Sequence, residues 1–215
     1  MKKILWCMMT AVAVVLLGSC TDKKECRIHG TVGIEQLNGK RIFLVPLYGP
    51  QTAEYVDSVE VKDGKFEFTT DTVMIAKLLM DYHYRMGVEQ LLVVTEPGDL
   101  EVVIDSVSSG RGTPQNDSLQ SWKELTQRHN RELAVVNRDA RMLAAQGDTA
   151  EAARVATRAR TLHQTYKDET RRRAATMPGT LVGDFLKGLF PLTYPKKMPD
   201  GSIVTMNADT HEPVN

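Results

Sequence analysis

The chain has 215 residues, of which 42% are hydrophobic and 25% are charged. These proportions are ordinary for a globular protein, and they exclude wholesale disorder. The 27 basic side chains are balanced by 27 acidic ones, whereas nucleic-acid-binding domains are usually strongly basic. We therefore expect no nucleic-acid partner. A chain of this length can also bury a core without disulfide bonds.

The first twenty residues have the pattern of an exported lipoprotein. Lys2 and Lys3 precede an uncharged apolar run that is shorter than the roughly 20 residues a membrane span needs. The segment 17–20, with the sequence LGSC, resembles the bacterial lipobox, which is cleaved before a cysteine that carries lipid. This resemblance implies acylation of Cys20, and several acyl chains together anchor a protein stably. Simple secretion is the alternative.

The sequence therefore predicts a protein of the cell envelope that is attached to a membrane, most simply the outer membrane, by its N-terminal lipid. The expected segments are a lipoprotein signal peptide at 1–19 and a lipidated N-terminus with a linker at 20–25.

Cysteine usage excludes an intramolecular disulfide in the mature chain. Cys7 leaves with the signal peptide and Cys20 carries lipid, so Cys26 is the free thiol that remains. The dithiol exchange that a Cys-x-x-Cys pair performs needs a second cysteine, which is missing. Cys26 is either a redox thiol that reacts with another protein or a packing residue at the start of the first strand. Packing is favoured because free cysteines are usually buried.

Residues 26–112 are predicted to form an antiparallel β domain. Short runs of β-forming residues alternate with turn residues, and no helical periodicity lasts for more than a turn. The clearest signal is an Asp63-Gly64 hairpin turn. Alternation on both sides of it predicts four inward side chains, Val59, Val61, Phe66 and Phe68. A β-sandwich or a partly open barrel is expected, with strands at 27–34, 41–46, 54–61, 65–69, 74–82, 90–95 and 100–105.

Residues 113–190 are predicted to form a long antiparallel helical hairpin and a short helix, so that the fold class is α+β. Apolar residues recur at helical spacing on both arms. Gly147 interrupts the pattern, and Asp148 with Glu151 forms a capping-box sequence at the start of the second arm. Arms of roughly 27 residues would extend about 40 Å, so part of the hairpin is expected to project. The remaining segment, 191–215, is predicted to be an irregular or loosely paired tail.

Charge is divided unevenly between the two parts. Residues 21–116 contain 10 basic and 15 acidic side chains, a net charge of −5, whereas residues 117–176 contain 12 and 8, a net charge of +4. Opposite charges either favour docking of the two parts or leave a basic arm for an acidic partner such as a phospholipid or an anionic glycan. The arginines at 171–173 are expected to offset the negative end of the helix dipole.

Few residues are candidates for a binding or catalytic site. Tyr82, His83, Tyr84 and Arg85 place aromatic rings and a cation at a predicted strand end, which suits the rim of a glycan or peptide site. An edge strand with ordinary exposed aromatic residues is the favoured interpretation. No Ser, His and Asp set is recognisable by motif, so we expect no catalytic residue and no cofactor.

Two histidines are expected to meet across the hairpin. His129 and His163 lie at nearly equal distances from the break at Gly147, so antiparallel helices bring them to a similar height. A metal site there would need further ligands, and Glu132 and Glu169 are only loosely placed to supply them. Ordinary contacts between the helices are the favoured interpretation, and no metal is expected.

Strand and turn motifs occur in order along residues 26–117. They are Ile28-x-Gly30-x-Val32, Gly39-Lys40-x-Ile42-x-Leu44, Asp57-Ser58-x-x-Val61-x-Asp63-Gly64-Lys65-Phe66-x-Phe68, Glu96-Pro97-Gly98 and Gly110-x-Gly112-Thr113-x-x-Asn116-Asp117. Together they resemble the uncharacterised β domain that precedes the thioredoxin-like domain in many Gram-negative envelope thiol-disulfide oxidoreductases of the peroxiredoxin and thioredoxin-like type. No thioredoxin domain and no Cys-x-x-Cys follow here, so the resemblance implies a fold and no redox activity.

Two hypotheses about function follow. The first is a non-catalytic, lipid-anchored binding or scaffold protein of the cell envelope, with an envelope protein or a glycan as its partner. The second is an accessory component of thiol-disulfide exchange that acts with a separate thioredoxin-like protein through Cys26. The first is preferred, because the chain lacks a catalytic domain and a second thiol.

Overall fold

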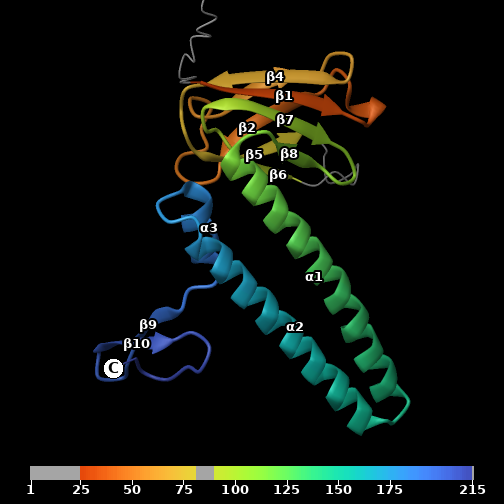
Figure 1. Ribbon diagram of the computed structural model, residues 1–215, viewed down its shortest axis with the longest axis vertical. Coiled ribbons are helices and arrows are strands. Elements are labelled where there is room, and N and C mark those ends of the chain that lie inside the picture. Colours follow the sequence, from red (N-terminus) through yellow and green to blue (C-terminus); the bar gives the residue numbers. More distant parts are fainter. Residues whose placement is uncertain (1–24, 81–89, 215) are drawn as a thin grey trace, which may run out of the picture.

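The computed structural model describes residues 25–80 and 90–214. They form two four-stranded sheets followed by two long paired helices, which confirms the predicted α+β fold (Figure 1). The predicted signal peptide with Cys20 and the predicted ligand rim, Tyr82, His83, Tyr84 and Arg85, lie outside the described residues.

The described part of the chain begins with strands and continues with helices. The strands of the two sheets are β1 (Cys26–Val32), β2 (Arg41–Pro46), β3 (Asp57–Glu60), β4 (Lys65–Thr70), β5 (Ile75–Met80), β6 (Leu91–Val94), β7 (Gly98–Ile104) and β8 (Ser109–Arg111), with the short 3-10 helix η1 (Glu35–Leu37) after β1. The helices are α1 (Pro114–Ala145), α2 (Thr149–Ala175) and α3 (Leu181–Leu189), and the last strands are β9 (Thr193–Lys197) and β10 (Ile203–Asn207).

The main core lies between the two sheets, whose strand orders are β4-β1-β7-β8 and β3-β2-β5-β6. Strands of both sheets contribute fully buried side chains, among them Ile28, Ile42, Leu78, Leu91 and Leu100. Every second residue of β4 is buried, as the alternation in the sequence predicts. The domain is therefore a β-sandwich, and a second apolar cluster joins it to α1 and α3.

The predicted hairpin at Asp63-Gly64 forms its turn but not its strand pair. Both turn residues have positive φ, 51° and 69°, and Lys62 pairs with Lys65. Beyond this bridge β3 pairs with β2, whereas β4 pairs with β1 in the other sheet. The turn thus carries the chain from one sheet to the other. Alternation does identify the buried side chains: Val61, Phe66 and Phe68 are buried, and Val59 packs against them.

Two features of the sheets differ from the expected antiparallel pattern. β1 and β7 are parallel neighbours, with Cys26 opposite Gly98 and Val32 opposite Ile104. The short strand β8 was not predicted, because its sequence Ser-Gly-Arg has no β-forming side chain. It forms because β7 offers an unpaired edge and because Gly110 fits beneath the side chains of Leu91 and Val93.

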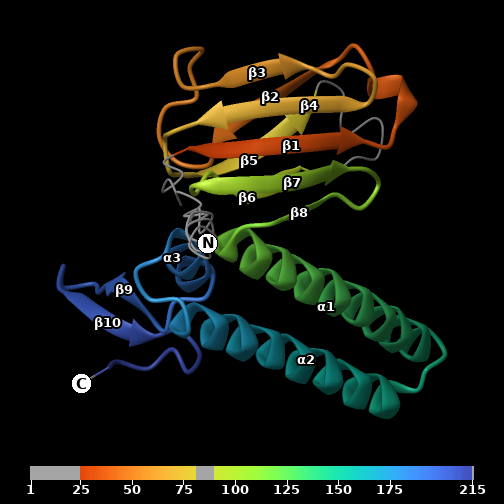
Figure 2. The same cartoon turned by 45° about the horizontal axis from the view of Figure 1, so that its top comes forward.

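The long helices form the predicted antiparallel hairpin, which extends away from the sandwich (Figures 1 and 2). Gly147 has a φ of +84°, and the Asp148 carboxylate accepts a hydrogen bond of 3.1 Å from the Glu151 backbone N–H. These residues therefore end α1 and start α2 as the capping pattern predicts. Within residues 25–80 and 90–214, no helix combines the length and the hydropathy of a membrane span.

In the tail at 191–215, predicted to be irregular or loosely paired, β9 and β10 form an antiparallel ribbon. The Val214 N–H also donates to the Thr205 carbonyl, which extends the pairing on the outer edge of β10. An isolated two-stranded ribbon is marginal in water. Here Asp209 binds both Lys167 and Arg171 of α2, and these bonds hold the pKa of its carboxyl at about 2. Tertiary contacts therefore stabilise the ribbon.

Candidate functional site: a groove between the long helices

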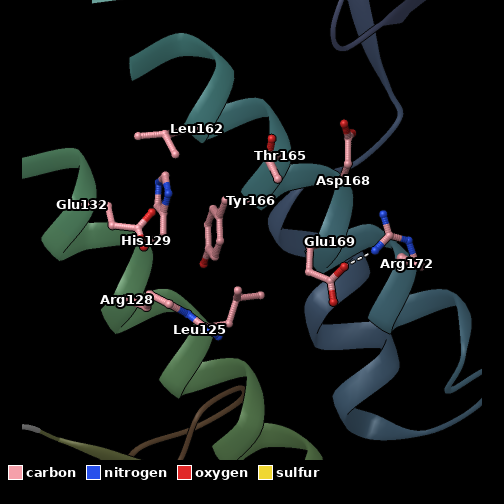
Figure 3. Close-up of a pocket in the computed structure, with 10 residues that line it drawn as sticks. All are labelled: Leu125, Arg128, His129, Glu132, Leu162, Thr165, Tyr166, Asp168, Glu169 and Arg172. Carbon is pink, nitrogen blue, oxygen red and sulfur yellow. Dashed lines mark hydrogen bonds and ion pairs between the residues drawn. The ribbon is translucent and has the colours of Figure 1, made fainter. Parts of the chain in front are cut away.

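A groove with a cavity volume of about 420 Å³ lies between the two arms of the hairpin (Figure 3). Four side chains from α1 and six from α2 line it, and they divide into a floor and two charged rims. The floor consists of Leu125, His129, Leu162 and Tyr166, and the rims of Arg128, Glu132, Thr165, Asp168, Glu169 and Arg172.

Paired rings separate the helices at the groove. The rings of His129 and Tyr166 are stacked with their centroids 4.4 Å apart and their planes within 3° (Figure 3). Nearer the tip of the hairpin the buried residue of α2 is Ala159, whose small side chain permits a close approach of the helices. The groove therefore opens where bulky rings replace small residues.

Two further contacts fix these rings in place. The Tyr166 hydroxyl and the Thr126 hydroxyl are hydrogen-bonded at 2.8 Å, which joins α2 to α1. His163 lies 5.7 Å from His129, at the height that the spacing about Gly147 predicts. Phe190, which follows α3, packs edge-on against Tyr166 and His163. The ring cluster thus consists of His129, His163, Tyr166 and Phe190.

The surroundings of His129 disfavour its protonation. His129 is only 7% exposed, and burial lowers the pKa of its imidazole below the usual 6.5. The neighbouring His163 lowers this pKa further, whereas Glu132 raises it. In residues 25–80 and 90–214 no three His, Cys, Asp or Glu side chains are grouped as metal ligands. Glu169, one of the two carboxylates considered for a metal, instead binds Arg172 and Arg173.

Both rims of the groove contain charges of both signs. Arg128 and Glu132 lie one turn apart on α1, whereas Asp168, Glu169 and Arg172 lie on α2. The Glu169 carboxylate pairs with the Arg172 guanidinium across one turn of α2 (Figure 3). Such exposed pairs contribute little to stability, but they decide which charges a partner must present.

The groove faces away from the β9–β10 ribbon. The ribbon is bound through Lys167 and Arg171, which share one face of α2. The groove residues Thr165 and Glu169 are offset from them by two positions, and this rotates them by about 200° around the helix. The ribbon therefore leaves the side of the groove with Thr165 and Glu169 uncovered, whereas Asp168 is paired with Arg171 at 3.7 Å. Within the described residues, the contacts between the hairpin and the sandwich lie near the start of α1 and at α3, so most of the basic arm is not docked on that part of the acidic β domain.

Residues 26–119, from β1 to the second turn of α1, match the model of a family described as a domain of unknown function (DUF4369). The chain contains a DUF4369 domain. No curated protein and no solved structure matches the chain. The matched range includes the whole sandwich but ends before the first groove residue. The groove thus belongs to the part of the chain that follows the DUF4369 domain.

The last motif of the DUF4369 domain joins α1 to the sandwich. Gly112 has a φ of +116°, and a Cβ there would lie 2.7 Å from the Asp99 carbonyl oxygen. Its N–H donates to the Asp117 carboxylate at 3.0 Å. The amide of Asn116 binds the backbone of Val94 on the edge of β6. Sequence reasoning missed this positioning role, although Gly-Thr-x-x-Asn-Asp at a helix start was a usable signal.

Cys26 lies at the start of β1 in the DUF4369 domain, inside the sandwich core. It is 1% exposed. Burial first, and then the charges of Glu96 and Asp99, raise the pKa of its thiol to about 11. Because the thiolate is the nucleophile in disulfide exchange, this position suppresses reactivity.

We expect Cys26 to react at least about 100-fold more slowly in the folded chain than in the unfolded one, because the raised pKa alone lowers the thiolate fraction by about that factor. The measurement is the rate of thiol release with an aromatic disulfide reagent, for a chain that starts at residue 21, in buffer and in denaturant. Equal rates in the two conditions would show that Cys26 is accessible and reactive.

Proposed function

We propose that this chain is a non-catalytic, lipid-anchored protein of the cell envelope that holds a protein partner in the groove between α1 and α2. The groove carries the proposal, because it is a cavity of about 420 Å³ on a hairpin that extends away from the sandwich (Figures 1 and 3). The anchor is supported by the basic start, the apolar run and Cys20, and these make the outer membrane the expected location.

The groove suits a protein segment better than a glycan or a lipid headgroup. Its two central rings stack on each other, so the face that each turns toward the other is closed to a sugar. Its rims carry Arg128 and Arg172 beside three carboxylates, so an anion gains little from them. A peptide or helix with apolar side chains for Leu125 and Leu162 and with charges of both signs matches both features.

The alternative is an accessory role in thiol-disulfide exchange with a separate thioredoxin-like protein. The resemblance of the β domain to that of envelope oxidoreductases supports it. The buried thiol of Cys26, with its pKa raised to about 11, argues against it, because exchange requires an exposed thiolate. We therefore prefer the groove as the binding element.

The test is photo-crosslinking from the groove in intact cells. Thr165 lines the groove, and Thr157 lies two turns away outside it; both are exposed threonines on α2 whose hydroxyls bond the backbone one turn back. A photoreactive amino acid at Thr165 should give a discrete adduct with one protein, and the same amino acid at Thr157 should not. Mass spectrometry of the adduct identifies the partner.

Charge reversal distinguishes the groove from the rest of the hairpin. Arg128→Glu, on the rim, should lower the Thr165 adduct more than about fivefold, whereas Arg158→Glu, outside the groove, should leave it unchanged. Equal yields from Thr165 and Thr157 would contradict a groove partner. A thioredoxin-like partner whose adduct disappears with Cys26→Ser would instead support the redox alternative.

A further inference from the structure

The ring cluster joins three separate parts of the chain at one point. His129 comes from α1, Tyr166 and His163 come from α2, and Phe190 follows α3. The ring centroids of His129 and His163 are 5.7 Å apart, and those of Tyr166 and Phe190 are 5.6 Å apart. The contact between the two arms at the groove therefore depends on rings, and one of them is a buried titratable group.

The groups around His129 do not stabilise a positive charge on it. On α1 the nearest charges are Glu132, which favours protonation, and Arg128, which lines the same groove. On α2 the facing groups are Tyr166 and the second histidine, His163. The segment after α3 contributes an uncharged ring. The remaining charged groups of the groove are Asp168, Glu169 and Arg172, and Glu169 is already bound by Arg172 and Arg173.

Protonation of His129 would thus place a cation in a buried stack beside another histidine. The burial cost and the repulsion by His163 exceed the attraction by Glu132, and together they lower the pKa of His129. A histidine whose pKa is lowered on folding binds fewer protons in the folded state than in the unfolded one. Stability is therefore full above the ordinary pKa of 6.5 and is lost as the pH falls below it.

We propose that the ring cluster is an acid-sensitive joint in the hairpin, where protonation of His129 separates α1 from α2 at the groove. The joint needs no partner in the groove, so it goes beyond the proposed function and can fail or succeed independently of it. The β9–β10 ribbon should stay in place, because the pKa of Asp209 is about 2 and its bonds to Lys167 and Arg171 survive mild acid.

Hydrogen exchange of the mature chain at about pH 7.5 and about pH 5 tests the joint, after correction for intrinsic exchange rates. Protection of the amides around His129 and Tyr166 should fall measurably at the lower pH, while that of the β9–β10 pairing stays constant. His129→Phe keeps the stacked ring and removes the titration, so its hairpin should lose no protection in acid. His211→Phe, at an exposed histidine that follows β10 and contacts Tyr194, should leave the acid response of the hairpin as in the wild type.

The joint is refuted if the wild-type hairpin keeps its protection in acid, or if His129→Phe loses as much as the wild type. If His129→Phe fails to fold, a nuclear magnetic resonance titration of the wild type tests the joint instead. The midpoint of hairpin opening must then coincide with the titration of His129, and a midpoint that follows His163 or the carboxylates overturns the assignment.

Discussion

Gly30→Ala is expected to destabilise the sandwich by about 3 kcal/mol, because a methyl group here overlaps a core ring. Gly30 lies in β1 between β4 and β7. A Cβ at this position would lie 1.9 Å from Cζ of Phe66. Phe66 is only 3% exposed, and its ring packs edge-on against that of Phe68. The ring must therefore leave its place, and the packing of two core aromatic residues is lost.

Urea unfolding of the mature chain measures this effect, and another glycine supplies the control. Gly188 lies in α3 with no atom within 4 Å of a Cβ, so Gly188→Ala should stabilise by about 0.5–1 kcal/mol through helix propensity. Adding Phe66→Leu to Gly30→Ala should recover part of the loss, because the smaller side chain vacates the position of the ring tip. A Gly30→Ala chain within about 0.5 kcal/mol of the wild type would contradict the overlap.

Asn116→Ala is expected to cost about 3 kcal/mol by leaving the edge of β6 without hydrogen bonds. The Asn116 side chain is buried, and its amide makes the hydrogen bonds to β6 that the backbone of a neighbouring strand would otherwise make. Its Oδ1 accepts from the Val94 N–H at 2.8 Å, and its Nδ2 donates to the Val94 carbonyl at 2.7 Å. The Nδ2 also donates to the Thr113 hydroxyl at 2.7 Å. Alanine satisfies none of these groups, and among the strands that the structure describes none pairs with this edge of β6.

The matched control is Asn130→Ala, at an exposed asparagine on the same helix. It should change the free energy of unfolding by less than about 0.5 kcal/mol, because alanine is the better helix former. Hydrogen exchange adds a local measurement, since the Val94 amide should lose protection in Asn116→Ala and keep it in Asn130→Ala. Similar losses in both variants would mean that Asn116 does not secure β6.

The candidate groove was only partly predictable from the sequence. Helical spacing about Gly147 predicts that His129 and His163 meet, and the apolar periodicity includes Leu125, Leu162 and Tyr166. The rims were not predicted, because whether charged side chains face a groove depends on the rotation and separation of the two helices. That separation results from the stack of His129 on Tyr166, which only the packed hairpin shows.

The structure of the tail was also only partly predictable from the sequence. The turn signal at Asp200-Gly201 is compatible with loose pairing of β9 and β10, but it does not predict a stable pair, because two strands alone bury too little surface. The ribbon exists because Asp209 meets Lys167 and Arg171, which lie about 40 residues earlier in the chain. An interaction over such a distance leaves no periodic pattern in the sequence.

The sequence by itself determined the elements whose causes are local. Alternation identified the buried residues of β4, and Gly147 with Asp148 determined where one helix ends and the next begins. The tertiary structure decided the partners: β3 and β4 join different sheets, β1 lies parallel to β7, and α1 is bound to β6 through Asn116. The physical reason is that a period or a cap acts within a few residues, whereas pairing depends on which surfaces meet after the chain has folded.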